Sequence, residues 1–138
     1  KQVESLKGER ARNIAARLME DEGSSRSVGN RKVIVSRQDD MSPDELRYLG
    51  DLLKERGASV VILGSGKAPR GFLMVMVDPG LASAGVDAVA IVRTGASALG
   101  GSGGGKKHLA QAGGKDFGQI DKALELAAAE AVAFLGRI

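Results

Sequence analysis

Apolar residues recur at helical intervals in four parts of the chain, the first of which is the N-terminal stretch 1–22. There Val3, Leu6, Ile14 and Leu18 stand among many charged residues, a pattern that predicts an amphipathic helical arm. The apolar stripe is thin, so the arm is expected to lean on the domain, on upstream sequence or on a second copy of itself. These four residues are therefore our candidates for dimerisation.

Three further stretches are predicted helices, and the first has the clearest start. Ser42, Pro43 and Glu45 form a capping box with proline at the first helical position. The helices and their marker residues are 43–56 with Leu46, Leu49 and Leu53 before a stop at Gly57, 86–99 with Val86, Val89, Arg93, Ala96 and Leu99, and 117–135 with Ile120, Leu124, Ala127, Ala131 and Leu135 before a stop at Gly136. The small residues 95–98 indicate that the second of these helices packs very close to a neighbour.

Strand patterns lie between these helices. The β-branched run Lys32–Ser36 predicts a first strand, and Ala58–Gly64 and Gly71–Asp78 predict a hairpin across a Gly-Lys-Ala-Pro turn. A glycine-rich loop from Gly100 is expected to lead into a short last strand ending near Gly114. The predicted class is α/β, a mixed β-sheet covered by helices and preceded by an N-terminal helical arm.

The organisation predicted from these elements is one globular domain with an arm. Small polar residues fill 23–30 and suggest a flexible joint. We therefore divide the chain into 1–30, the arm and joint at the end of an upstream helical region, and 31–138, the globular domain. The chain opens at Lys1 rather than Met, so the true N-terminus is expected upstream.

Composition removes several kinds of chemistry. The 138 residues contain no cysteine and one histidine, His108, which excludes thiol catalysis, disulfides and multi-histidine metal sites within the chain. No apolar run reaches the roughly 20 residues that span a bilayer, so no membrane contact is expected. The aromatic residues are Tyr48, Phe72, Phe117 and Phe134, too few for the stacking platform of common single-strand RNA binders. Nucleic-acid contact would have to rely on backbone shape and phosphates.

Glycine and positive charge concentrate in the same segment. Nine of the 24 residues from Gly95 to Gly118 are glycine. Between Val60 and Lys115 the sequence has six lysines and arginines but only two aspartates. Ordering a glycine costs about 0.5–1 kcal/mol of conformational entropy relative to alanine. We therefore expect a compensating interaction for this run. A Walker phosphate loop is excluded because no serine or threonine follows Lys106 and Lys107. A Rossmann fingerprint is excluded because the glycines follow a late helix.

The run Gly100–Gly114 carries a family resemblance. It reads GGSGGGKKHLAQAGG and resembles the G-G-x-G-G-G-R-x-x-x-A-Q-x-G-G pattern of the DHH-associated domain that ends alanyl-tRNA synthetases. Lys106 stands where arginine is usual, and Lys107 and His108 replace a frequent proline and aspartate. With the order of the predicted elements, the resemblance covers residues 31–138.

This resemblance implies a non-catalytic fragment that binds the outer corner of tRNA(Ala), supports aminoacylation and editing, and contributes to homodimerisation. It implies no catalytic residue, metal or cofactor in the fragment, while the parent enzyme would use ATP, magnesium and zinc in the cytoplasm. The candidate RNA-binding residues are Gly103, Gly104, Gly105, Lys106, Lys107, His108, Gln111, Arg93 and Lys115.

Other readings stay open at this point. DHH-family phosphoesterases carry a related terminal domain that holds substrate, but their pattern places histidine directly after the glycines, whereas Lys106 and Lys107 intervene here. A dimerisation module with little nucleic-acid binding is a second alternative. The long form of stand-alone alanyl-tRNA editing enzymes is a third.

Overall fold

Six strands and five α-helices make up the described part of the chain, residues 2–39 and 41–138, with side chains described from Gly8 onward except at position 40. The strands are β1 (Ser25–Val28), β2 (Arg31–Arg37), β3 (Val60–Lys67), β4 (Arg70–Val77), β5 (Ser102–Lys106) and β6 (Leu109–Gly114). The helices are α1 (Gln2–Glu20), α2 (Pro43–Glu55), α3 (Pro79–Ser83), α4 (Ala88–Ala96) and α5 (Ile120–Gly136). Three 3₁₀ turns accompany them, η1 (Glu22–Ser24), η2 (Ser97–Leu99) and η3 (Phe117–Gln119).

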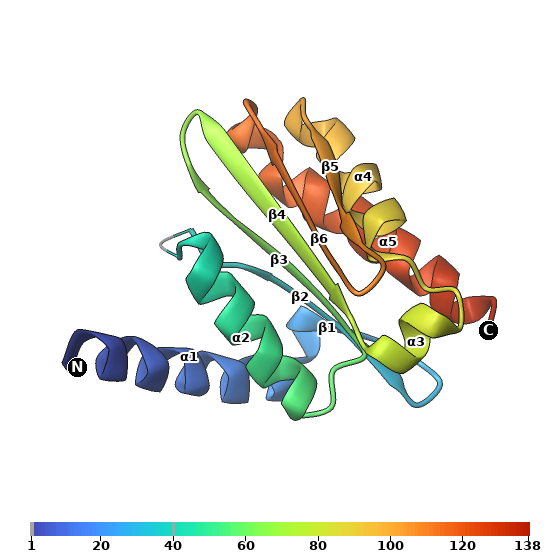
Figure 1. Cartoon of the computed structure of the whole chain (residues 1–138), viewed down its shortest axis with the longest axis horizontal. Helices are drawn as coiled ribbons and strands as arrows, with labels where there is room; N and C mark the ends of the chain where they lie inside the picture. The colour runs from blue at the N-terminus through green and yellow to red at the C-terminus, as the bar shows by residue number, and fades with distance from the viewer. Residues whose placement is uncertain (1, 40) are drawn as a thin grey trace.

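The strands form one mixed sheet in the order β1-β2-β3-β4-β6-β5. β2 and β3 are parallel because α2 carries the chain back between them, and the other neighbours are antiparallel. Figure 1 shows α1 and α2 on one side of the sheet and α4 and α5 on the other. The predicted α/β class, with a mixed sheet covered by helices and preceded by an N-terminal helix, is confirmed.

Two hydrophobic cores lie on opposite sides of this sheet. One combines α4 and α5 with residues such as Ile62, Leu73 and Val75. The other places α1 and α2 over alternate residues of the same strands, among them Leu63 and Met74. Because successive residues of a strand point to opposite faces, a central strand between two helical layers is apolar on both faces.

Local sequence signals set the ends of α2 and the packing of α4 as predicted, whereas the predicted helix 86–99 is α4 followed by η2 and the predicted helix 117–135 is η3 followed by α5. The Ser42 hydroxyl accepts a hydrogen bond from the backbone N–H of Glu45 at 3.3 Å, and the Glu45 carboxylate accepts one from the N–H of Ser42 at 3.1 Å. Gly57 follows α2 with φ of +107°, a left-handed conformation that suits glycine. In α4, a Cβ on Gly95 would lie 2.7 Å from the carbonyl oxygen of Ala123, which confirms the close packing expected there.

Three segments differ from the prediction. The expected flexible joint, 23–30, contains β1, which pairs with β2 across a two-residue Gly29-Asn30 turn. Arg26 of β1 also forms an ion pair with Glu125 of α5 at 2.7 Å. The glycine run expected to be a loop forms β5, because its backbone pairs with β6. Finally, α3 was not predicted, although Asp78 caps it ahead of Pro79 much as Ser42 precedes Pro43.

The N-terminal helix packs on the domain. Ile14 and Leu18 are buried in the core shared with α2, so in this structure their own chain covers them. The side chains of Val3 and Leu6 lie outside the described ones. Pairing of two copies through this helix stays a prediction. Within residues 2–39 and 41–138, no helix is long and apolar enough to cross a membrane.

The capping box supplies a stability prediction. Ser42→Ala removes the side-chain acceptor at the N-terminus of α2, and we expect it to lower the free energy of unfolding by about 1 kcal/mol. Urea denaturation followed by circular dichroism measures this change. Ser83→Ala, at an exposed serine that is not a helix cap, is the control and is expected to change stability by less than about 0.5 kcal/mol. Equal effects of the two substitutions would contradict a specific role of the cap.

Candidate nucleic-acid interface

The β5–β6 hairpin carries most of the predicted site and has two unlike faces. Directly paired residues of an antiparallel hairpin share a face. Gly103 pairs with Ala112 and Gly105 with Ala110, and both alanines are buried in the core with α4 and α5. The residues on the opposite side of the hairpin, which we call the hairpin face, are Ser102, Gly104, Lys106, Leu109, Gln111 and Gly113.

The inner face of the hairpin packs directly against α4. A Cβ on Gly103 would lie 2.8 Å from Cγ1 of Val92 and 2.9 Å from Cβ of Ala112, so a side chain there would collide. Arg93 of α4 donates a hydrogen bond from Nε to the carbonyl oxygen of Gly103 at 3.1 Å. Gly103 therefore points toward α4 rather than outward, and Arg93 ties β5 to the helix through its backbone.

The hairpin face has two glycines at positions where the described residues leave room for a side chain. A Cβ on Gly104 would meet nothing within 4 Å, and one on Gly113 would meet only the carbonyl oxygen of Gly71 at 3.8 Å. Neither residue has a positive φ. Together with exposed Gln111, they make a low surface on which a flat ligand could approach the backbone.

A basic cleft borders this face where it meets α2. The cleft has a volume of about 440 Å³, and its lining includes Arg47 of α2 and Lys106, His108 and Gln111 of the hairpin. Arg47 and Lys106 are exposed, and no ion pair to either is found among the described residues. We call it the Arg47 cleft. The sequence did not reveal Arg47 as a candidate. The pattern of α2 shows which residues are exposed, but it does not show which strands lie beside each exposed side chain.

The turn of the hairpin holds Lys107 and His108. Their carbonyl oxygens accept hydrogen bonds from the N–H groups of Ala88 at 2.8 Å and Val77 at 2.9 Å, which anchor the turn while both side chains stay exposed. Within the described residues no carboxylate bonds to His108. The turn therefore presents positive charge at one end of the hairpin face.

The opposite end of the hairpin face lies near Lys115, Lys67 and Arg70. Lys115 directly follows β6, so the structure separates it from Lys106 and Lys107 by the length of the hairpin. Arg37, near this end of the sheet, is held by Asp39 at 2.9 Å and Asp121 at 3.0 Å. Its hydrogen bond to Asp39, and to a smaller extent the one to Asp121, raises the pKa of the Arg37 guanidinium above its ordinary value.

Comparison with known proteins decides the family. A sequence model of the DHHA1 domain matches residues 30–133. The chain belongs to the DHHA1 domain family. It is 34% identical over 126 residues to an alanine–tRNA ligase of Dehalococcoides mccartyi, an alignment that covers 91% of this chain and 14% of the ligase. The chain thus spans about one-seventh of that relative's length.

Solved structures agree with this DHHA1 assignment. The C-Ala domain of alanyl-tRNA synthetase from Aquifex aeolicus superposes with a TM-score of 0.66 at 28% identity, covering 81% of this chain and 97% of that domain. The resemblance to the carboxy-terminal domain of alanyl-tRNA synthetases is therefore confirmed. RecJ from Thermus thermophilus superposes with a TM-score of 0.65 at 16% identity, covering 99% of this chain and 19% of RecJ. That likeness shows a shared fold.

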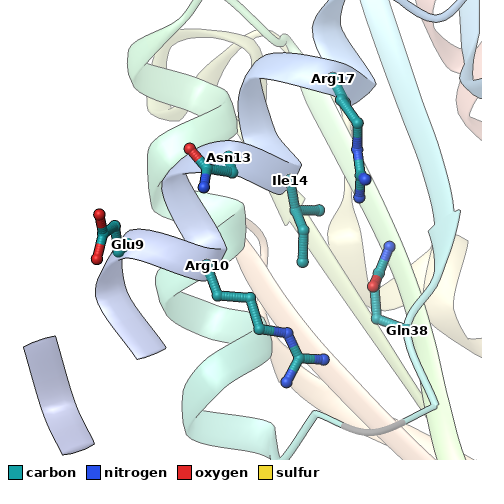
Figure 2. A pocket seen from close by; sticks show the side chains of 6 residues that line it. All are labelled: Glu9, Arg10, Asn13, Ile14, Arg17 and Gln38. Atoms are coloured by element: carbon teal, nitrogen blue, oxygen red, sulfur yellow. The ribbon is translucent and has the colours of Figure 1, made fainter. Parts of the chain in front are cut away.

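A second hollow lies along α1, and all its lining residues except Gln38 precede the DHHA1 match; the acidic Glu9 is among them. The hollow has a volume of about 550 Å³ and is lined by Arg10, Arg17 and Gln38, with Ile14 among its other lining residues. Figure 2 shows the Arg10 and Arg17 side chains extending from α1 on the same side as Ile14, with the Gln38 amide near the end of Arg17. Among the described residues, no group of three or more acidic or histidine side chains could hold a metal ion.

Adding a methyl group to the two faces of the DHHA1 hairpin is expected to change the free energy of unfolding by different amounts. Gly103→Ala should lower the free energy of unfolding by about 1–3 kcal/mol because the new Cβ collides with Val92. Gly104→Ala, the matched control one residue away, should stay within about 0.5 kcal/mol because its Cβ meets open space. Urea denaturation of both variants checks the difference. A Gly104→Ala variant as unstable as Gly103→Ala would show that the hairpin face is not open.

Proposed function

We propose that the chain is a non-catalytic RNA-binding part of an alanine–tRNA ligase, and that its hairpin face contacts the outer corner of tRNA(Ala). The observation that carries this proposal is the pair Gly104 and Gly113, two exposed glycines with open or ordinary space around them. Glycine in a strand weakens it without adding a side chain to pack. A ligand that approaches the backbone closely would explain why these positions lack side chains.

The shape and charge of the hairpin face suit a folded RNA. Gly104, Gly113 and Gln111 leave a low surface, against which the flat base pair at the corner of tRNA can lie. Lys106 and Arg47 border that surface, where they can reach phosphates on either side. Lysine at position 106 keeps the charge of the family's usual arginine but gives up bidentate geometry. The contact is therefore expected to depend on charge more than on a fixed hydrogen-bond pattern.

The relatives support placing this function in an alanine–tRNA ligase. The alanine–tRNA ligase and the C-Ala domain align with this chain at 34% and 28% identity. RecJ, at 16% identity, is similar in fold alone. Support for aminoacylation and editing, homodimerisation and a cytoplasmic location are part of the proposal. So is the absence of catalysis by the fragment itself. The ATP, magnesium and zinc expected of the parent enzyme belong to residues outside this chain.

The charge contribution can be measured with transcribed tRNA(Ala). Lys106→Ala with Lys107→Ala should weaken binding and reduce the slope of log affinity against log salt, because each lost phosphate contact removes about 0.7–0.9 from that slope. Filter binding over a series of salt concentrations gives both quantities. The control is Arg31→Ala with Lys122→Ala, which removes the same net charge at exposed positions away from the hairpin. A slope that stays the same in the Lys106 and Lys107 variant would refute the contact.

The role of the bare surface is tested separately from charge. Gly104→Val keeps every charge, and its Cβ would meet nothing within 4 Å, yet it raises a branched side chain from the hairpin face. We expect tRNA affinity to fall about tenfold, equivalent to roughly 1.4 kcal/mol, with the salt slope little changed. Gly136→Val, at an exposed glycine with open space at the end of α5, is the control. Unaltered affinity in Gly104→Val would mean that RNA does not rest on this face.

A further inference from the structure

A separate pocket opens at the far end of the hairpin face, beside the β3–β4 turn. Its volume is about 590 Å³, within the range of roughly 300–1,000 Å³ typical of small-molecule sites. Apolar side chains of Met41, Pro43, Pro69 and Phe72 contribute to its walls. We call it the Phe72 pocket. None of the candidate residues drawn from the sequence lies in it.

Phe72 gives this pocket an aromatic wall beside a bare strand. The residue directly opposite Phe72 on β6 is Gly113, which has no side chain to cover the ring. Phe72 is half-buried and packs against the core under α2, so its position is held from below. A flat ring that enters the pocket can lie against Phe72 while it passes over the backbone of Gly113, which also lines the pocket.

Two exposed cations line the pocket, and neither has an ion-pair partner among the described side chains. Lys67 and Arg70 face each other across the β3–β4 hairpin, and both line the pocket and are exposed. Like charges directly opposite on paired strands are destabilising. No ion pair to either residue is found in residues 8–39 and 41–138, and no described residue that lines the pocket is acidic. An anion between them would relieve this repulsion.

We propose that the Phe72 pocket binds a nucleotide, with its base against Phe72 and its phosphate between Lys67 and Arg70. An apolar, partly aromatic wall beside two cations matches the chemistry of a base joined to a phosphate. Gly113 belongs to both the pocket and the hairpin face, so an RNA lying on that face could extend an unpaired nucleotide into the pocket. The choice of an RNA nucleotide as occupant rests on the proposed function.

The binding chemistry is tested first with adenosine 5′-monophosphate, inorganic phosphate and adenosine as probes. Isothermal titration of the chain should show the monophosphate binding more tightly than either part alone. Phe72→Leu, which keeps an apolar side chain against the core, should weaken monophosphate binding about fivefold or more and leave phosphate binding unchanged. Lys67→Gln with Arg70→Gln should weaken both. Tyr48→Leu is the aromatic control, since Tyr48 is 42% exposed on α2 and lies outside the pocket.

The source of the nucleotide is tested with two RNAs, one with an unpaired loop and one a full duplex of equal length. A weaker affinity of Phe72→Leu for the looped RNA alone identifies an RNA nucleotide as the occupant. Monophosphate binding that depends on Phe72, with both RNAs unaffected, identifies a free nucleotide. If neither the monophosphate nor the looped RNA responds to Phe72→Leu, the proposal is wrong. The Lys106 and Lys107 variant should weaken both RNAs, so failure of the hairpin face and failure of the pocket are distinguishable.

Discussion

The packing of α4 directly onto the backbone of β5 is the contact on which the rest of the structure depends. Val92 occupies the space that a side chain on Gly103 would need, and Arg93 holds the carbonyl oxygen of Gly103. An edge strand in which three of five residues are glycine has little packing of its own. With α4 and β6 holding it, β5 keeps its place in the sheet and its other face stays bare.

This arrangement separates two uses of glycine that look the same in the sequence. Gly95 and Gly103 are small because neighbouring atoms lie within 3 Å of their absent Cβ positions. Gly104 and Gly113 are small although no described residue crowds them. Packing requires glycine at the first pair, whereas the second pair lies on the exposed hairpin face, where we propose that a ligand binds. Positive charge lies at both ends of that bare strip, from Arg47 and Lys106 at one end to Lys67 and Arg70 at the other.

Most elements could be predicted because their signals are local. The capping box at Ser42 and the buried leucines of α2 depend on spacing along one helix, which the sequence displays directly. The two errors in the sheet have the opposite origin. β1 and β5 are edge strands of polar or glycine residues whose pairing comes from neighbours, so their own composition resembles a loop. The Gly29-Asn30 turn was the one local signal that could have revealed β1.

The sequence by itself determined the α/β class, the start and end of α2 and the family pattern around Gln111, because each rests on residues close together in the chain. Only the tertiary structure decided which glycines are exposed, that Arg47 reaches the hairpin, and that Phe72 shares a pocket with Gly113. Those relations join β4 or α2 to a hairpin formed much later in the chain. The pairing of β6 with β4 brings them together, and no pattern within a single element encodes that pairing.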